Sequence, residues 1–401
     1  MAQTTDRSLT ADGAIAILGG CGHVGLPLGM MFASTGLSVV LIDRDGGRVE
    51  QVNAGEMPFV ERGAHQMLPG LIESGRLHAT VDVARLSDAA TVVITIGTPV
   101  DEFLDPSVHE FDSAMIDVAG HLRPGQLVVL RSTVFPGITE HLSRLLVGRG
   151  LEVDLAYCPE RIAQGYALEE LKTLPQIVSG TSDRAVERAT RLFRRICPDT
   201  ITLRPIEAEL AKLFTNAWRY IHFAISNQFY ILANKFDADF YKIHHAIRWQ
   251  YQRMQGFASA GFTAGPCLLK DTMQLAAFNH GAFPLGQAAM LVNESLPYYV
   301  VQQLAKRFDL ATSVVGILGM AFKANSDDPR SSLAYKLRKV LMLECRQVLC
   351  TDPYIRDPSF LDLGEVLERA DVLVLGACHD AYRNLQTSKP IVDISNFLGQ
   401  R

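Results

Sequence analysis

The amino-acid sequence predicts an α/β protein in which two Rossmann-like, doubly wound parallel-sheet domains are joined by a central helical domain with a long helix. Three patterns favour this fold: short apolar runs alternate with amphipathic stretches early in the chain, a long apolar helical pattern follows, and short β-rich runs return near the end. Strands that alternate with helices form a parallel sheet covered on both faces. A chain of 401 residues has room for two or three domains of roughly 100–200 residues each.

The first domain, predicted over residues 1–205, rests on five short apolar runs that indicate buried strands. These runs are Ala14–Leu18, Ser38–Ile42, Thr91–Ile96, Leu127–Leu130 and Val153–Tyr157. The amphipathic stretches between them fit the helices that cover a doubly wound sheet.

The central domain, residues 206–305, is predicted to be mostly helical. Apolar residues recur at helical spacing from Ile206 past Phe229 without a breaker, which predicts one long helix from Glu207 to about Lys235. A Gly-rich loop over residues 256–265 interrupts the helical pattern.

The last domain, residues 306–401, is predicted to be a second α/β domain. Its short β-rich runs are separated by helical stretches such as Leu333–Cys345. The runs are Ser313–Leu318, Gln347–Thr351, Asp371–Leu375 and Ile391–Ile394.

Composition and charge exclude several classes of function. The 38 basic and 43 acidic residues give a net charge of −5, which offers no electrostatic footprint for a nucleic acid. The polar start lacks the pattern of a secretory signal, and no run approaches the roughly 18 apolar residues of a membrane span, so we expect a cytoplasmic protein. Seven scattered cysteines without a C-x-x-C pair indicate neither a disulfide framework nor a metal site.

A cofactor site is predicted directly after the first strand. Residues Gly20-Cys21-Gly22-His23-Val24-Gly25 have the G-x-G-x-x-G spacing and open an apolar helix, where backbone N–H groups bind a pyrophosphate. Asp43 ends the next strand about twenty residues on, where a carboxylate accepts from the ribose hydroxyls of NAD. It would repel the 2′-phosphate of NADP, although its neighbour Arg44 is of the type that accepts this phosphate in some sites.

Hydroxyl side chains also follow two later strands. Thr98 comes after the third predicted strand, and Ser132 and Thr133 come after the fourth. Ligands of an open parallel sheet bind at the carboxyl ends of its strands, so these residues are candidates for the same site. An ordinary hydroxyl in a turn explains each of them equally well.

Four further segments carry a family resemblance. They are the segment Tyr157-Cys158-Pro159-Glu160-Arg161-Ile162-Ala163-Gln164-Gly165, Lys212 to Asn216 on the long helix, Gly261 to Asp271, and Phe322 to Arg330. With the glycine motif, they resemble the UDP-glucose/GDP-mannose dehydrogenase family over essentially the whole chain. The resemblance implies oxidation of the C6 alcohol of a nucleotide sugar to a carboxylate, with two NAD molecules used in turn and no free aldehyde released.

The resemblance makes Cys267 the nucleophile, which forms a thiohemiacetal with the bound aldehyde and then a thioester that water hydrolyses. The surrounding sequence is consistent with this role, because a Gly-rich loop leads to Cys267 and an expected helix begins near Leu269. A helix N-terminus and the nearby Lys270 favour the thiolate, whereas the charge of Asp271 opposes it. The other six cysteines are best interpreted as small buried hydrophobic residues.

The resemblance also assigns the remaining site residues. Lys212 and Asn216 are four residues apart on one helix face, suited to an oxyanion, and Glu160 is placed near the hydrolytic water. The catalytic set is Cys267, Lys212, Asn216, Asp271, Glu160 and Thr133. The substrate set is Glu160, Lys212, Asn216, Arg253, Gly261, Phe262 and Lys323. The cofactor set is Gly20, Gly22, His23, Val24, Gly25, Asp43, Thr98, Ser132, Lys270 and Arg330.

Two departures from the family pattern bear on the substrate. Gln164 stands where the family often has a second glutamate, and the cysteine segment is A-G-P-C-L-L-K-D instead of G-G-S-C-x-P-K-D. The retained pair Lys270-Asp271 favours UDP-glucose, oxidised to UDP-glucuronate, over a UDP-N-acetylhexosamine. A UDP-N-acetylhexosamine and GDP-mannose are the alternative substrates. A two-electron dehydrogenase of the hydroxyacid type and a non-catalytic protein that binds sugar nucleotides are less favoured functions for the same fold. The long apolar helix is expected to form a homodimer core.

Overall fold

The computed structural model describes residues 14–97, 101, 107–263 and 265–399. The chain divides into two compact units, Met1–Leu213 and Phe214–Arg401. The division into three domains that the sequence predicts stays a prediction.

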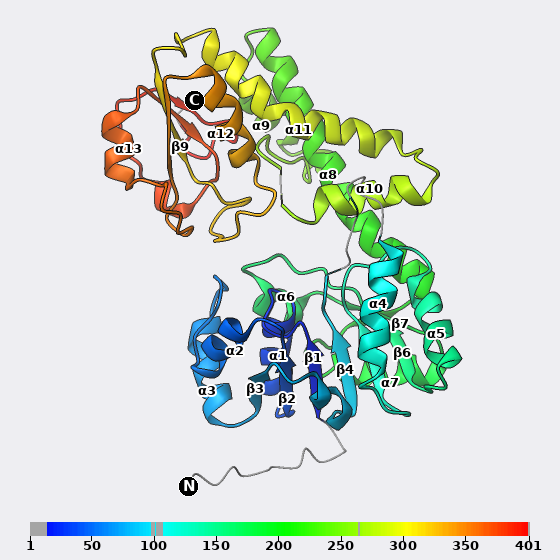
Figure 1. Ribbon diagram of the computed structural model, residues 1–401. Helices are drawn as coiled ribbons and strands as arrows, with labels where there is room; N and C mark the ends of the chain where they lie inside the picture. The colour runs from blue at the N-terminus through cyan, green and yellow to red at the C-terminus, as the bar shows by residue number, and fades with distance from the viewer. Residues whose placement is uncertain (1–13, 98–100, 102–106, 264, 400–401) are drawn as a thin grey trace. The chain divides into compact units, whose positions relative to one another are not determined.

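The described residues of the first unit form an eight-stranded sheet with the order β3-β2-β1-β4-β5-β6-β7-β8, flanked by helices (Figure 1). The strands are β1 Ile15–Leu18, β2 Val39–Ile42, β3 Leu77–Thr80, β4 Thr91–Ile94, β5 Leu127–Leu130, β6 Asp154–Tyr157, β7 Gln176–Gly180 and β8 Thr200–Thr202. The helices are α1 Gly25–Ser34, α2 Gly46–Asn53, α3 Ala64–Glu73, α4 Val108–Ala119, α5 Ile138–Gly148, α6 Ala167–Thr173 and α7 Asp183–Phe193, with the 3-10 helix η1 Val83–Asp88.

The order of the first six strands is that of a Rossmann fold, and these strands are parallel. The parallel register places Leu18, Ile42 and Ile94 side by side at the carboxyl end of the sheet. Beyond β6 the sheet differs from the expected parallel arrangement, because β7 runs antiparallel to β6. β8 is again parallel to β7.

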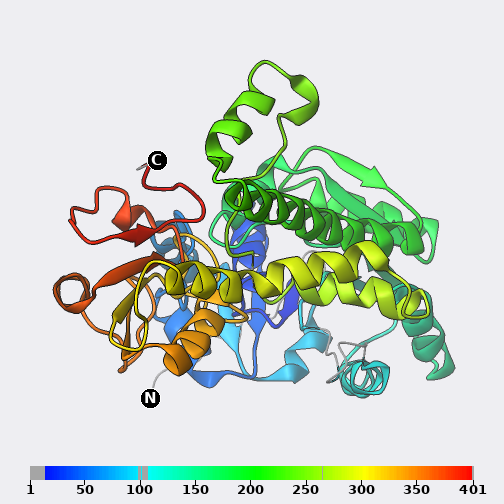
Figure 2. The same cartoon turned by 90° about the horizontal axis from the view of Figure 1, so that it is seen from above.

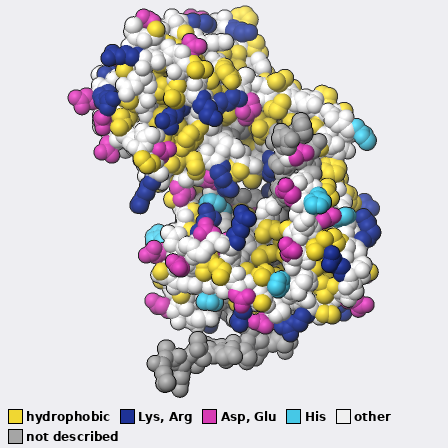
Figure 3. Space-filling view, in the orientation of Figure 1, with side chains coloured by type: hydrophobic (Ala, Val, Ile, Leu, Met, Phe, Trp, Pro, Cys, Tyr) yellow, Lys and Arg dark blue, Asp and Glu magenta, His cyan; other side chains and the backbone are white. Residues whose placement is uncertain are grey.

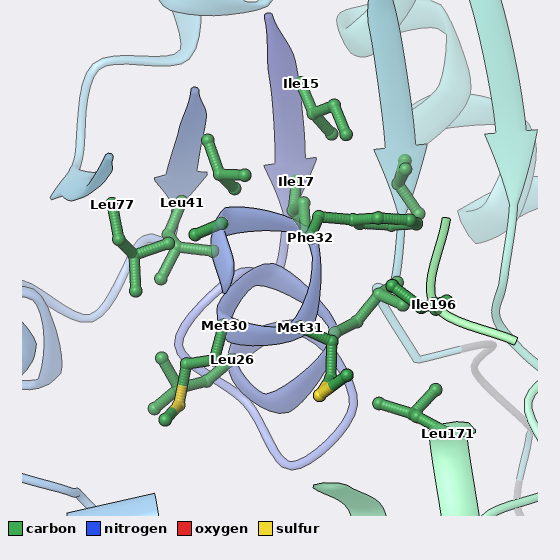
Figure 4. Close-up of a cluster of buried hydrophobic side chains, with 14 of the residues drawn as sticks. Ile15, Ile17, Leu26, Met30, Met31, Phe32, Leu41, Leu77, Leu171 and Ile196 are labelled. Atoms are coloured by element: carbon green, nitrogen blue, oxygen red, sulfur yellow. The ribbon is translucent and has the colours of Figure 1, made fainter. Parts of the chain in front are cut away.

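The two faces of this sheet bury separate hydrophobic clusters. Ile15 and Ile17 of β1 face the cluster around α1, whereas Ala16 between them faces the other. In the first cluster Phe32 of α1 lies beside Ile17 and is fully buried (Figure 4). Helix α1 is apolar all round because it is buried through nearly its whole length, as a helix in a domain core must be.

The second unit contains a four-stranded sheet with the order β10-β9-β11-β12, in which all described neighbours are parallel. Its strands are β9 Val314–Leu318, β10 Gln347–Thr351, β11 Val372–Leu375 and β12 Ile391–Val392. Helices α12 Leu333–Glu344 and α13 Leu363–Arg369 pack on it, and the 3-10 helix η3 is Asp380–Tyr382.

The remaining helices lie between the two sheets in the sequence, over residues 205–305. They are α8 Pro205–Lys235, which begins in the first unit and continues into the second, α9 Phe240–Arg248, η2 Gln252–Met254, α10 Leu268–Phe278 and α11 Pro284–Ala305. Helix α8 confirms the long helix expected from the sequence. Helix α11 runs alongside α8 (Figure 2), and Asn227 of α8 donates to Asn293 of α11 at 2.9 Å. Helix α11 also packs against α10 and α12.

Basic and acidic side chains are interspersed on the face drawn in Figure 3, in keeping with the small net charge. Among the described residues, no helix combines the length and apolar character that crossing a bilayer requires. The described His, Cys, Asp and Glu side chains form no group of three or more that is arranged to hold a metal ion.

Candidate active site

The glycine motif of the first unit has the shape of a pyrophosphate cradle. A Cβ atom on Gly20 would lie 2.7 Å from the Cα of Leu41, and one on Gly25 would collide with the carbonyl oxygen of Gly19, so both positions require glycine. A Cβ atom on Gly22 would meet only the Gly19 oxygen, 3.4 Å away, so the backbone there is open to a ligand. Because α1 has neither a side-chain cap at Val24 nor an acidic residue in its first turn, its N-terminus suits an anion.

Asp43, at the end of β2, is fixed beside this turn. Its Oδ2 accepts from the backbone N–H of Cys21 at 3.0 Å, and its Oδ1 accepts from that of Asp45 at 3.2 Å. Each carboxylate oxygen can accept a second hydrogen bond, so the side chain fits ribose hydroxyls while it holds the glycine turn.

Thr95, which the sequence reasoning missed, supports the same turn. Its hydroxyl donates to the carbonyls of Leu18 at 2.8 Å and Gly19 at 3.1 Å. Thr95 could have been recognised as a hydroxyl residue at the end of a predicted strand, which is the same feature that made Ser132 a candidate. The Ser132 hydroxyl donates to the Ile96 carbonyl and, at 3.3 Å, to that of Ile94, so it joins the ends of β4 and β5.

The cofactor role of Ser132 stays a prediction. Thr133, which follows it, is half-buried, and its predicted catalytic role is not tested by its position. Thr98 lies outside the described residues.

Glu160 is part of a buried ion pair. Its Oε2 accepts from Nη2 of Arg131 at 2.6 Å and from Nε at 3.0 Å, and Arg131 is fully buried. Its Oε1 accepts from the backbone N–H groups of Arg161 at 2.7 Å and Ile162 at 2.9 Å. Both oxygens therefore hold the turn after β6, and the catalytic and substrate-binding roles predicted for Glu160 stay predictions.

Gln164, one of the departures from the family pattern, lies against the glycine motif. Its Nε2 is 3.0 Å from Nδ1 of His23, and the His23 ring lies 4.0 Å from that of Phe59. Glu61, which the sequence did not single out, holds the following turn by accepting from the N–H groups of Gly165 at 2.8 Å and Ala167 at 2.7 Å. In this chain a neutral amide, that of Gln164, thus lies beside His23.

Helix α8 buries a row of polar residues along an otherwise apolar face. Glu209 accepts from the N–H groups of Gly137 at 2.6 Å and Thr139 at 2.8 Å, which caps α5. Burial raises the pKa of Glu209, although hydrogen bonds from Thr139 and Gly137 oppose the shift. Lys212 and Asn216 lie on one face of the helix, as their spacing predicts, and both are buried.

Cys267 stands at the N-terminus of α10 and is exposed, whereas the other six cysteines are buried or half-buried. The fully buried Asp271 follows one turn later: Asn216 donates to its Oδ2 at 2.5 Å, and Nζ of Lys270 lies 2.8 Å from its Oδ1. The structure therefore brings four of the predicted residues together. The interaction of Lys270 with Asp271 is not its predicted contact with the cofactor, which remains untested.

The loop before Cys267 is held by residues that the sequence did not reveal. Oδ1 of Asn227 accepts from the N–H of Gly261 at 2.8 Å, and Ser226 donates to the carbonyl of Ala258 at 2.7 Å. Burial lowers the pKa of His244, whose Nε2 lies 3.1 Å from the carbonyl oxygen of Phe257. Phe262 is half-buried beside this anchor.

Three further cations predicted to bind substrate or cofactor lie on other segments of the second unit. Arg253 is exposed and donates to the hydroxyl of Tyr251 at 3.3 Å. Lys323 and Arg330 belong to the loop after β9, residues 319–332, which we call the β9–α12 loop. Lys323 is half-buried, and Arg330 is paired with Asp328.

A buried pair at the end of β10 holds the β9–α12 loop. Asp352 accepts from the N–H of Met320 at 2.6 Å and lies 3.1 Å from Nε2 of His379, whose Nδ1 accepts from the N–H of Asn325 at 2.9 Å. Burial alone would raise the pKa of Asp352, but the His379 and backbone hydrogen bonds lower it overall. Asp352 thus repeats the role that Asp43 plays in the first sheet.

Models of a known protein family match this chain. Three domain profiles match in order: an NAD binding domain at residues 14–197, a central domain at 206–295 and a UDP binding domain at 316–400. The chain belongs to the UDP-glucose/GDP-mannose dehydrogenase family. It is therefore a member of a family of NAD-dependent nucleotide-sugar dehydrogenases, with NAD as the cofactor.

Two curated relatives extend along nearly the whole chain. The UDP-N-acetyl-D-mannosamine dehydrogenase of Pyrococcus horikoshii is 29% identical over 382 residues, which cover 92% of this chain and 90% of the relative. The NDP-N-acetyl-D-galactosaminuronic acid dehydrogenase of Ralstonia solanacearum is 27% identical over 413 residues, which cover 96% and 95%.

Two solved structures resemble this fold. The UDP-D-ManNAc dehydrogenase of Pyrococcus horikoshii has a TM-score of 0.89 at 27% identity and covers 97% of this chain and 96% of its own. A UDP-glucose dehydrogenase of Pyrobaculum islandicum has a TM-score of 0.88 at 26% identity and covers 98% and 96%.

We expect NAD to be preferred over NADP because the Asp43 carboxylate stands at the ribose end of the glycine turn. In the Asp43→Asn variant, the ratio of kcat/KM for NAD to that for NADP should fall by about tenfold, which corresponds to about 1.4 kcal/mol. Steady-state kinetics with both cofactors measure this ratio, and Glu50→Gln on the exposed face of α2 is the matched control. A parent enzyme with the higher kcat/KM for NADP would contradict the prediction.

Proposed function

We propose that this protein oxidises the C6 alcohol of a UDP-N-acetylhexosamine to a carboxylate, with NAD as the oxidant and Cys267 as the nucleophile. The observation that supports the reaction is the cluster of Cys267, Asn216, Lys270 and Asp271 at the start of α10, in a chain matched by all three family profiles. The names of the relatives support the substrate class.

This substrate class revises the expectation from sequence. The Lys270-Asp271 pair favours UDP-glucose, but both curated relatives described above are named for N-acetylated sugars. The structural likeness to a UDP-glucose dehydrogenase at 26% identity keeps UDP-glucose as the second candidate. A dipeptide is a weaker guide than similarity over nine-tenths of the chain, because Lys270 pairs with Asp271 and so has a local role with any sugar.

The chemistry divides into two oxidations and one hydrolysis. NAD supplies the hydride acceptor, once for each oxidation, and the glycine turn with Asp43 would hold it. Oxidation of the C6 alcohol releases a proton and leaves an aldehyde, to which the Cys267 sulfur adds to form a thiohemiacetal. Its oxidation leaves a thioester on Cys267, and water then breaks the C–S bond to release the carboxylate and restore the thiol.

The polar residues of α8 and α10 are suited to the charge that develops on the C6 oxygen. The Lys212 ammonium and the Asn216 amide are donors on the buried face of α8, where fixed donors stabilise an oxyanion more strongly than water does. Asp271 accepts from the Asn216 amide and thereby fixes its orientation. In this proposal Asp271 also orients the hydrolytic water.

A substrate panel tests the proposal. NADH formation should give the highest kcat/KM with a UDP-N-acetylhexosamine, among UDP-ManNAc, UDP-GlcNAc, UDP-GalNAc, UDP-glucose and GDP-mannose, and two NADH should form for each sugar oxidised. A highest kcat/KM with UDP-glucose would overturn the substrate class. One NADH for each sugar would overturn the thioester route, and no NADH with any sugar would indicate a binding protein.

We also infer that two copies associate through α8. Its part in the second unit exposes large apolar side chains at helical spacing, a pattern that marks an interaction surface when it is contiguous. These side chains are Phe214, Trp218, Ile225, Phe229 and Leu232, and the exposed Phe236 directly follows the helix. A second copy of the same helix presents a matching apolar stripe, as a symmetric dimer requires.

Sedimentation velocity at micromolar concentration should give a dimer for the parent and mostly monomer for the double variant Ile225→Glu, Phe229→Glu. The added carboxylates would be desolvated without partners in the interface. Arg219→Glu changes the charge at an exposed polar position of the same helix and should leave the dimer intact. A parent that sediments only as a monomer would contradict the inference.

A further inference from the structure

We propose that Arg330 is the electrostatic partner of the Cys267 thiol: the guanidinium, held in place by Asp328, stabilises the thiolate that attacks the sugar aldehyde. The inference rests on the proposed role of Cys267 as the nucleophile. It gives Arg330 a task at the thiol, different from the contact with NAD that the family resemblance implies.

The segment that carries the thiol lies directly on the β9–α12 loop. The backbone N–H of Gly265 donates to the carbonyl of Ser331 at 3.3 Å, and a Cβ atom on Gly265 would lie 2.6 Å from the Phe322 ring. Cys267 comes two residues after Gly265, and Arg330 immediately precedes Ser331. Gly265 has φ of 109°, so only glycine suits both this backbone and this contact.

Arg330 is held in one orientation by a two-pronged ion pair. Its Nη2 donates to Oδ2 of Asp328 at 2.6 Å, and its Nε donates to Oδ1 at 2.9 Å. Asp328 is buried and its Oδ1 also accepts from the backbone N–H of Arg330 at 3.0 Å. A planar guanidinium fixed in this way retains its charge while more than half of its side chain stays exposed.

The charges around the Cys267 thiol indicate that Arg330 is the cation that acts on it. Hydrogen bonds to Asp328 raise the pKa of Arg330, and the nearby Cys267 thiolate adds to that rise. On α10, Lys270 is offset by Asp271, 2.8 Å away, and the Asn216 amide also contacts that carboxylate. The N-terminus of α10 adds positive potential at the thiol, whereas Asp328 partly offsets the charge of Arg330.

The test is the rate at which iodoacetamide alkylates Cys267 in the full-length protein, followed by mass spectrometry of the Cys267 peptide across about pH 6–10. In Arg330→Gln the midpoint of the pH profile should rise, and alkylation at pH 7 should slow by roughly three- to tenfold, since a tenfold change in thiolate population corresponds to one pKa unit. Arg330→Lys should restore most of the rate. Arg356→Gln, an exposed arginine of the same unit, should behave as the parent.

An unchanged midpoint in a folded Arg330→Gln variant would overturn the pairing, as would equal slowing in Arg356→Gln. If Arg330→Gln loses its cooperative thermal transition, Arg330→Met is a second neutral variant for the same comparison. Alkylation needs neither NAD nor a sugar nucleotide. A midpoint shift in a protein that oxidises no sugar nucleotide would therefore contradict the proposed function alone, whereas an unchanged midpoint in an active enzyme would contradict the pairing alone.

Discussion

Replacement of Cys267 with Ala is expected to lower the rate of acid formation on the order of 10³-fold or more, because it removes the nucleophile of the second oxidation. An alcohol reaches the aldehyde by hydride loss alone, but oxidation onward needs a covalent adduct or a hydrate. Cys267 is exposed at the start of a helix, so Ala should leave the fold intact. Product analysis by mass spectrometry measures the carboxylate, and binding of NAD and the sugar nucleotide should persist.

The Cys267→Ser variant distinguishes a thioester from other roles of the thiol. Serine can form the same type of adduct, but its oxygen ester hydrolyses more slowly than a thioester. Intact-protein mass spectrometry should therefore show an acyl-enzyme after incubation with NAD and the best substrate. Cys345→Ser is the matched control, because burial raises the pKa of the Cys345 thiol to about 11 and makes it a poor nucleophile.

Near-parental acid formation by Cys267→Ala would make the thiol structural and end the thioester proposal. The remaining cysteines are poor substitutes for it, because Cys197 is buried and the other thiols have raised pKa values. Burial raises the pKa of Cys21 and Cys158 to about 12, and that of Cys350 and Cys378 to about 11. Compensation by a neighbouring thiol would thus not explain such a result.

The parts of the fold that the sequence predicted are those set by local pattern. The glycine motif and Asp43 are recognisable because their spacing reflects one turn and one strand. Strands β3 and β8 lack a continuous apolar run, since β3 exposes His78 and β8 exposes two of its three residues, and so they were missed. Strand β7 was also missed, and its antiparallel direction depends on its pairing with β6, which the sequence pattern does not reveal.

The residues that support the site were missed for a related reason. Thr95, Asn227 and His379 act on backbone groups that are distant in sequence, and the fold alone brings these groups within reach. Cys267 and Asn216 were found because a family pattern marks them, and a pattern does not reveal partners. Glu160 was found in the same way. Its ion pair with Arg131 could not be predicted from the sequence, because a fully buried arginine is rare.

Replacement of Glu160 with Ala is expected to destabilise the first unit by about 3–5 kcal/mol, because it leaves the Arg131 charge buried without its partner. Two backbone N–H groups, those of Arg161 and Ile162, also lose their acceptor. Thermal denaturation and hydrogen exchange of β5 and β6 in the full-length protein measure the loss. Glu169→Ala, at an exposed position of the following helix α6, is the control and should be nearly neutral.

The Glu160 variants also separate the structural role from the predicted catalytic one. If the carboxylate serves the ion pair, Arg131→Met combined with Glu160→Ala should recover part of the lost stability, since the double change removes both charges together. If Glu160 instead handles the hydrolytic water, Glu160→Ala should retain the parental stability and accumulate a thioester on Cys267. A Glu160→Ala variant with parental stability and parental turnover would contradict both roles. Loss of a carboxylate that pairs with the buried Arg131 should lower the stability or the turnover.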